Sequence, residues 1–257
     1  MDKYFTRETI IAIGLVFPGL MTALGAVPVF FTKNVSQKLL DVMLGFAAGI
    51  MLSATCFSLV MPSIEYGGGD FKAVMITSAG IVLGAFIIDM IDKFSPHEHL
   101  IDKRREGVSS SLSQIWLFII AITIHNFPEG MATGVGFGTE NIGDGLALAL
   151  GIGIQNMPEG LAVALSLMRE KYSVRYAFIV AALTGLVEPV GAVLGFGLVN
   201  IFKPVLPVVL ASAAGAMLFV ICDEIIPETH SKGYEREATY GIIFGFVIMM
   251  VLDILLG

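Results

Sequence analysis

Charged side chains are scarce in this sequence. Only 14% of its 257 residues are Asp, Glu, Lys or Arg, whereas 56% are hydrophobic. Soluble domains are about a quarter charged, so this composition excludes an ordinary soluble protein. We expect the chain to lie in a lipid bilayer, and we expect no nucleic-acid partner.

Cysteine is also nearly absent. The two cysteines, Cys56 and Cys222, both fall inside apolar stretches. Two such residues do not indicate a disulfide framework. We expect both to pack as small apolar side chains within the membrane.

Long apolar runs are abundant, and a run of about 18 or more residues is typical of a membrane helix. We predict an all-α membrane protein with eight transmembrane helices in a single domain over residues 1–257. The third and eighth runs are the weakest, so seven or nine spans are the alternatives. The first run is too long for a cleaved signal peptide, and Asp2 and Glu8 stand where such a peptide is basic. The predicted spans cover about 10–31, 40–62, 72–92, 113–137, 145–168, 175–200, 204–226 and 238–256.

The few basic residues are distributed unequally among the connections between spans. Of the 15 Lys and Arg residues, only Lys3, Arg7, Lys72 and Lys203 fall in the N-terminal segment or in even-numbered connections. By the positive-inside rule, both termini face outward. We therefore expect a multi-pass protein of the cell's plasma (inner) membrane with both termini outside. The basic residues of the odd-numbered connections are Lys33, Lys38, Lys93, Lys103, Arg104, Arg105, Arg169, Lys171, Arg175, Lys232 and Arg236.

The second and seventh spans share a sequence signature. Residues 47–52 (AAGIML) and 213–218 (AAGAML) align at an offset of 166, and Cys56 and Cys222 keep the same offset. Because these spans run in opposite directions, we predict an inverted repeat that relates spans 1–3 to spans 6–8 around a central pair, spans 4 and 5. Chance similarity between two helices rich in small residues is the alternative.

Two connections have distinctive compositions. Residues 93–112 form the longest one, which is polar and predicted to be cytoplasmic. Its His97 and His99 could collect metal ions weakly, although a solvated loop without such a role is the stronger expectation. The three glycines at 67–69 predict a tight external turn.

The central spans contain a motif that occurs twice, 30 residues apart. Each copy places metal-capable side chains at positions i, i+1 and i+4 beside a proline, inside an apolar stretch. Polar groups at that depth are costly and usually functional. Two matching copies therefore predict one site built from two facing helices. The copies read His125-Asn126-Phe127-Pro128-Glu129-Gly130 and Gln155-Asn156-Met157-Pro158-Glu159-Gly160.

Helix geometry brings the polar groups of each copy together. The first residue and the glutamate are four positions apart, so they project from the same face of the helix. The asparagine between them can border the same cavity. Pro128 and Pro158 have no amide hydrogen, so the carbonyl groups of Ile124 and Ile154 are free to bind a ligand or water. The glycine that ends each copy permits close approach of another helix.

The charge at the predicted midplane requires compensation. Glu129, Glu159 and Glu188 all fall near it, and burying one ionised carboxylate costs about 2.5–3.5 kcal/mol on insertion scales. No Lys or Arg lies near the centre of any predicted span, so protons or cations must compensate the charge. One imidazole nitrogen with several oxygens suits Zn²⁺, Fe²⁺, Mn²⁺ or Cd²⁺ better than an alkali ion.

The two motifs together resemble the ZIP (Zrt/Irt-like) family of divalent metal transporters, particularly its bacterial GufA-like branch. The likeness extends over the whole chain and includes residues 223–228 (DEIIPE). It implies a homodimer, not an enzyme, that imports Zn²⁺ and related ions by an elevator-like or rocking exchange against a scaffold.

The resemblance also implies the ligands of two neighbouring metal sites. Close bacterial members can carry Asp where this chain has Asn156, and many other members carry His where it has Gln155. Because Asn156 adds no charge to the three glutamates, whereas two divalent ions bring four positive charges, we expect the second ion to bind more weakly. The first site would comprise His125, Glu129, Gln155 and Glu159; the second would comprise Asn126, Glu129, Asn156, Glu159 and Glu188.

Acidic residues near the predicted ends of spans suggest a route for the ion. We predict an exit path beside which His97, His99 and His230 lie, and an outer entrance at Glu65. Interfacial charges that contact lipid headgroups are the alternative reading. The predicted exit residues are Asp89, Asp92, Asp223 and Glu224.

Two functions of other classes remain open. A proton-coupled carrier of an organic solute would use the glutamates for titration alone, but His125 and the paired amides argue against it. An intramembrane metal-dependent hydrolase would use a carboxylate beside metal-bound water. Against it, the sequence has no His-Glu-x-x-His motif.

Overall fold

The chain folds into a bundle of long helices. The computed structural model describes residues 6–32, 35–94, 97–98, 105–106, 114–201, 203–231 and 233–256. Apart from helices, this part of the chain contains one short antiparallel pairing between β1 (His97–Glu98) and β2 (Arg105–Glu106). The helices are α1 (Arg7–Ala26), η1 (Val27–Phe30), α2 (Gln37–Ala54), η2 (Thr55–Val60), α3 (Met61–Tyr66), α4 (Phe71–Phe94), α5 (Gln114–Gly138), α6 (Ile142–Arg169), α7 (Val174–Gly185), α8 (Val187–Ile201), η3 (Lys203–Val205), α9 (Leu206–Val220), η4 (Ile221–Ile225), α10 (Ile226–Thr229) and α11 (Glu235–Leu256).

Long apolar helices confirm the predicted all-α membrane character. Within the described residues, seven helical stretches are long and apolar enough to cross a membrane. The predicted fourth span coincides with α5, a helix of 25 residues that is not among the seven, so the count of eight spans stays a prediction. The seven are Arg7–Phe30, Gln37–Tyr66, Phe71–Ile91, Ile142–Arg169, Val174–Ile201, Lys203–Thr229 and Glu235–Leu256.

Short polar side chains mark where the helices begin. Thr6, Ser36, Asn141 and Ser173 each accept a hydrogen bond from a backbone N–H in the first turn of α1, α2, α6 and α7. Asp70 accepts one from the first turn of α4 at 2.8 Å. Such caps satisfy amide groups that have no partner within the helix, so they fix the points at which the apolar stretches start.

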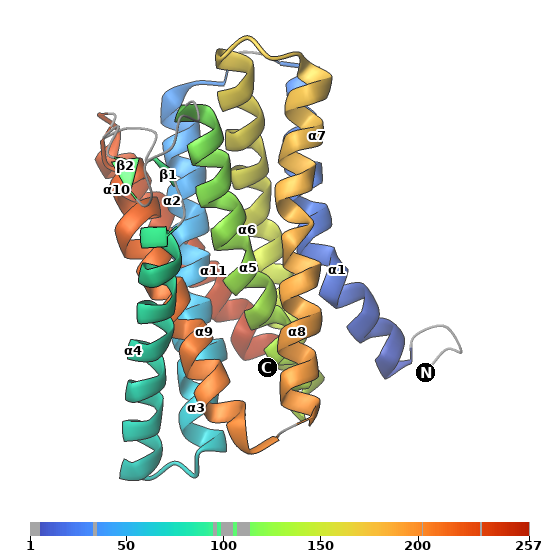
Figure 1. Cartoon of the computed structure of the whole chain (residues 1–257), viewed down its shortest axis with the longest axis vertical. Coiled ribbons are helices and arrows are strands. Elements are labelled where there is room, and N and C mark those ends of the chain that lie inside the picture. The colour runs from blue at the N-terminus through green and yellow to red at the C-terminus, as the bar shows by residue number, and fades with distance from the viewer. Residues whose placement is uncertain are drawn as a thin grey trace.

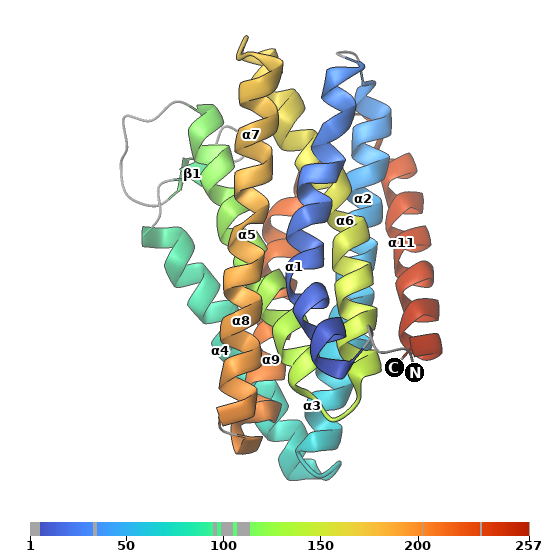
Figure 2. The same cartoon turned by 90° about the vertical axis from the view of Figure 1, so that its right-hand side faces the viewer.

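The turn predicted at the glycines between α3 and α4 is confirmed. Gly68 has φ of +107° and Gly69 has φ of +69°, which is backbone that glycine adopts without steric cost. This turn lies at the same end of the bundle as the start of α1 and the end of α11 (Figure 2). The described chain therefore begins and ends on one side of the bundle.

The most extensive helix contacts form four pairs: α2 with α11, α4 with α9, α5 with α8, and α1 with α6. The helices lie roughly along the long axis of the bundle, and α5 and α6 contact each other in its middle (Figure 1). Helix α6 also contacts α2 and α11, while α5 contacts α9. The central helices therefore join the α1, α7 and α8 side to the α2, α4, α9 and α11 side.

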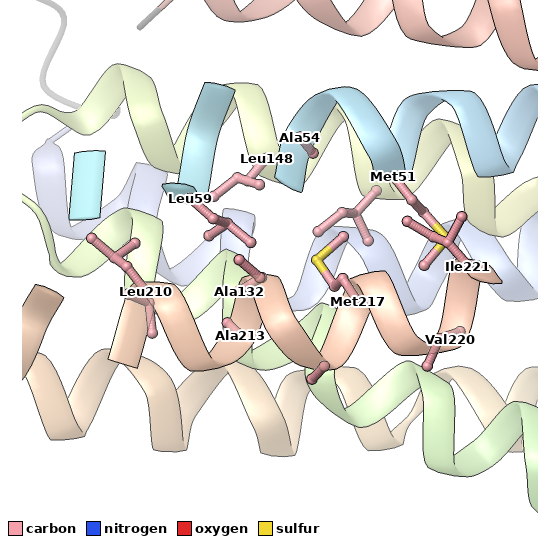
Figure 3. Packing of buried hydrophobic residues seen from close by; sticks show 14 of the residues in the cluster. Met51, Ala54, Leu59, Ala132, Leu148, Leu210, Ala213, Met217, Val220 and Ile221 are labelled. Carbon is pink, nitrogen blue, oxygen red and sulfur yellow. The ribbon is translucent and has the colours of Figure 1, made fainter. Parts of the chain in front are cut away.

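An apolar cluster fills the junction between these two sides. Met51 and Leu59 extend from α2 and η2, and Leu210 and Met217 extend from α9 towards them (Figure 3). All four side chains are fully buried. Ala132 of α5 belongs to the same cluster, so the core reaches the helix that carries the first polar motif.

Helices α2 and α9 each change to a π-helical turn at the same place in their sequences. The turn η2 begins at Thr55 and the turn η4 begins at Ile221, each three residues after the shared signature. Pro62 and Pro227 then follow within α3 and α10. Because π turns insert one extra residue and are frequent at functional sites, both places are candidates for a role beyond packing.

Candidate metal site

All seven residues predicted to bind metal lie in the interior. Four belong to the facing helices α5 and α6 as pairs four residues apart, two are the asparagines beside them, and the seventh is on α8. None is more than 5% exposed. The residues are His125, Asn126, Glu129, Gln155, Asn156, Glu159 and Glu188.

The glycine that ends each motif allows two further helices to approach, as predicted. A Cβ atom on Gly130 would lie 2.1 Å from the carbonyl oxygen of Glu188 in α8. A Cβ atom on Gly160 would lie 2.0 Å from the carbonyl oxygen of Thr22 in α1. Because neither contact leaves room for a side chain, α8 packs against the first motif and α1 against the second.

A hydrogen bond links the two central helices. Gln155 Nε2 of α6 donates to Glu129 Oε1 of α5 at 2.7 Å. Hydrogen bonds to charged acceptors are the stronger kind, at about 1.5–3 kcal/mol. This contact therefore aligns the first motif with the second.

The second asparagine connects α6 to both α8 and α1. Asn156 Nδ2 donates to Glu188 Oε2 at 2.6 Å and to the carbonyl oxygen of Pro18 at 3.1 Å. Glu188 Oε1 accepts a further bond from Thr22 Oγ1 at 3.0 Å. The Glu188 carboxylate is thus held by donors from two different helices.

The first asparagine makes a similar connection on the other side. Asn126 Nδ2 of α5 donates to the carbonyl oxygen of Thr184 in α7 at 3.0 Å. Both asparagines thus bind a backbone carbonyl through their amide nitrogen, and their side-chain oxygens do not take part in these contacts.

The imidazole of His125 reaches a residue that sequence reasoning had placed on the exit path. Its Nε2 atom lies 3.0 Å from Glu224 Oε1, in the π turn η4. The side chain of His125 is 4% exposed and that of Glu224 is 12% exposed. A carboxylate from the α9 side of the bundle thus meets the first motif directly.

Several oxygen atoms of the site have no hydrogen-bond partner among the described residues. They are buried, and buried acceptors without donors are rare and costly in proteins. Each of them carries full or partial negative charge, which is the property of an oxygen ligand for a cation. The atoms are Asn126 Oδ1, Glu129 Oε2, Gln155 Oε1, Asn156 Oδ1 and Glu159 Oε1.

The described residues do not form a closed metal cage in this arrangement. Among them, no three His, Cys, Asp or Glu side chains lie close enough to hold one ion. In this arrangement the amide hydrogens of Gln155 and Asn156 lie against carboxylates, and His125 faces Glu224. Rotation of each amide would replace its nitrogen by its oxygen at the same place.

The structure shows the surroundings of four other residues of the predicted pathway. Asp89 pairs with Lys93 at 2.6 Å, Asp223 is half-buried, and Glu65 is exposed. His230 hydrogen-bonds Thr229 and Thr239. The side chains of Asp92 and His97, and all of His99, lie outside the described residues.

Sequence reasoning missed the contribution of α1. Thr22 binds the Glu188 carboxylate, and the Pro18 carbonyl binds Asn156. Thr22 did carry a signal in the sequence, because it is a hydroxyl residue within an apolar run. The backbone carbonyl of Pro18 carried none, since its partner lies 138 positions away.

Comparisons with known proteins identify the family of this chain. The sequence model of the family described as ZIP Zinc transporter matches residues 95–253. Zinc transporter ZIPB of Bordetella bronchiseptica is 42% identical, over 92% of this chain and 78% of that protein. Zinc transporter GufA of Myxococcus xanthus is 41% identical, over 93% and 96%. Zinc transporter ZIP11 of Homo sapiens is 34% identical, over 95% and 96%. The chain therefore belongs to the ZIP zinc transporter family.

Proposed function

We propose that this chain carries Zn²⁺, and with it Fe²⁺, Mn²⁺ and Cd²⁺, into the cytoplasm through a midplane site between α5 and α6. The observation that carries the proposal is the set of five buried oxygens without hydrogen-bond partners among the described residues. Relatives of this chain are named as zinc transporters, and none of the names cited above is that of an enzyme. The hydrolase and the organic-solute carrier are therefore not favoured.

Two neighbouring ions account for the arrangement of donors. The first would bind His125, Glu129, Gln155 and Glu159. The second, weaker ion would bind Asn126, Glu129, Asn156, Glu159 and Glu188. Both sets require the amides to turn their oxygens inward, so we expect the ion to replace hydrogen bonds that now hold the glutamates.

The inverted repeat that we propose is supported by the contacts around the site. Asn126 and Asn156, 30 residues apart, donate to the carbonyls of Thr184 and Pro18, and these two acceptors are 166 positions apart. The same offset separates the starts of the π turns η2 and η4. An approximate twofold relation would exchange α5 with α6 and spans 1–3 with spans 6–8.

Close helix contacts distant from the site support the same relation. A Cβ atom on Gly49 of α2 would lie 2.0 Å from the Ile242 carbonyl oxygen of α11. A Cβ atom on Gly215 of α9 would lie 1.9 Å from the Ile81 carbonyl oxygen of α4. The two glycines are again 166 positions apart. The proposed twofold relation would place α2 on α9 and α11 on α4, so the α2–α11 pair would correspond to the α9–α4 pair.

Helix pairing also suggests which parts would move. We propose that α1, α5, α6, α7 and α8 carry the ion and that α2, α4, α9 and α11 form the scaffold, because the four most extensive contacts fall within these groups. Inverted repeats build alternating access in many transporters in this way. Contact of His125 with Glu224 would then join the moving site to the scaffold at the start of the exit path.

The sidedness follows from charge. We propose a homodimer in the plasma (inner) membrane with both termini outside, an entrance near Glu65, and an exit lined by Asp89, Asp92, Asp223 and Glu224. A reporter fused after residue 257 should then be accessible from outside the cell. Accessibility of both ends only from the cytoplasm would reverse the orientation.

Uptake of labelled Zn²⁺ into proteoliposomes tests the function. The native protein should take up Zn²⁺, and a Glu129→Ala, Glu159→Ala variant should not, because the change removes two buried carboxylates of the site. Glu170→Gln is a matched control, since it removes one exposed carboxylate at the end of α6. Uptake by the double variant at the native rate would end the proposal.

A further inference from the structure

Thr22 is a hydroxyl residue in the interior of α1. It is 1% exposed, and its Oγ1 atom donates to Glu188 Oε1 at 3.0 Å. Figure 2 shows α1 between α8 on one side and α6 on the other, and α1 contacts both of these helices. The hydroxyl thus lies where the glutamate of α8 meets the second motif of α6.

The position of Thr22 matches that of Glu188 in the other half of the chain. The two residues are 166 positions apart, the offset that also relates Pro18 to Thr184. Their carbonyl oxygens occupy equivalent places, since that of Thr22 abuts Gly160 and that of Glu188 abuts Gly130. The approximate twofold relation therefore places a hydroxyl opposite a carboxylate, and the two bond to each other.

We infer that Thr22 is a positioning residue of the second metal position, so that α1 contributes a side chain to the site together with α5, α6 and α8. The inference rests on the proposed function. Its hydroxyl fixes Glu188 Oε1 and leaves Glu188 Oε2 facing Asn156. When the Asn156 amide turns to present its oxygen, the carboxylate keeps its orientation through Thr22 alone.

A packing role for Thr22 makes the opposite prediction for two substitutions. Thr22→Val keeps the shape of the side chain but removes the donor, whereas Thr22→Ser keeps the donor but deletes a methyl group. If Thr22 positions Glu188, Val should be the harmful replacement and Ser the tolerated one. If Thr22 only fills space, Ser should be the harmful one.

The experiment is a Zn²⁺ titration by calorimetry of the full-length native protein and of Thr22→Val, Thr22→Ser and Thr55→Val. Thr55 is a matched control, because it is a buried threonine whose hydroxyl donates to the Met51 carbonyl oxygen, four residues earlier in the same helical stretch. We expect Thr22→Val to weaken the weaker ion roughly tenfold, as loss of a hydrogen bond to a charged group implies. The tighter ion should be unchanged, and Thr22→Ser and Thr55→Val should both bind like the native protein.

The outcomes separate the two proposals. The positioning role of Thr22 is wrong if Thr22→Val binds Zn²⁺ as tightly as the native protein does, or if Thr22→Ser binds Zn²⁺ more weakly than Thr22→Val. In both cases the proposed metal site stands. If the native protein binds no Zn²⁺, the proposed function itself fails and the inference fails with it. Selective loss of the weaker ion in Thr22→Val alone establishes the positioning role.

Discussion

Replacing Asn156 by Asp should change both the stability of the metal-free protein and its capacity for a second ion. Asn156 Nδ2 lies 2.6 Å from Glu188 Oε2, so the substitution removes a donor and puts a second carboxylate in its place. Loss of a hydrogen bond to a charged group costs about 1.5–3 kcal/mol. Without metal, we therefore expect the free energy of unfolding of the Asp variant to fall by about 2 kcal/mol or more.

With metal present, the same added charge should become favourable. Glu129, Glu159 and Glu188 supply three negative charges, whereas two divalent ions supply four positive ones. Asp at position 156 would make the loaded site neutral. An uncompensated charge at this depth costs about 2.5–3.5 kcal/mol, and about 1.4 kcal/mol is a factor of ten. The second ion should therefore bind roughly 100-fold more tightly in the variant.

Two measurements check this prediction. Calorimetric titration with Zn²⁺ gives the affinity of each ion, and thermal unfolding with and without Zn²⁺ gives the change in stability. Asn156→Ala is the matched control, because it removes the donor without adding charge and should lower stability with no gain in the second ion. Two equally tight ions in the native protein, or no gain in the Asp variant, would show that charge does not control this site.

Other predictions concern the remaining contacts of the site. His125→Ala should weaken Zn²⁺ uptake and shift preference towards Mn²⁺, because it removes the imidazole nitrogen; unchanged ion ranking in competition assays would contradict this. Gly160→Ala should lower the free energy of unfolding by about 1–3 kcal/mol or more, since its Cβ would lie 2.0 Å from the Thr22 carbonyl oxygen. Gly197→Ala is the control, because the space around Gly197 is open, and it should leave the free energy of unfolding unchanged. Equal effects of the two changes in denaturant unfolding would refute the close contact. Asp89→Asn combined with Glu224→Gln should slow uptake without abolishing binding, and normal uptake would remove both residues from the exit path.

The helices were largely predictable from the sequence. The apolar runs predicted at 40–62 and 145–168 lie inside the helical stretches Gln37–Tyr66 and Ile142–Arg169. A membrane helix must satisfy its backbone internally over a fixed length, so composition alone places it. The π turns η2 and η4, which follow α2 and α9, were not predicted, because a single inserted residue leaves an apolar run unchanged in composition.

The site was predictable only in its local part. Pairs such as His125 with Glu129 follow from helix periodicity, so the motif sufficed for them. The contact between His125 and Glu224 depends on how α9 packs against α5, which no local pattern encodes. For the same reason the sequence showed Thr22 as a polar residue in span one but gave no partner for it.

The coordination of bound Zn²⁺ tests the central claim most directly. X-ray absorption spectroscopy on the Zn²⁺-loaded protein should show oxygen ligands and one imidazole nitrogen at about 2.0–2.2 Å, with no sulfur at about 2.3 Å. This signal should vanish in the Glu129→Ala, Glu159→Ala variant. A sulfur shell, or a spectrum that the double variant leaves unchanged, would place the ion elsewhere and contradict a metal site between α5 and α6.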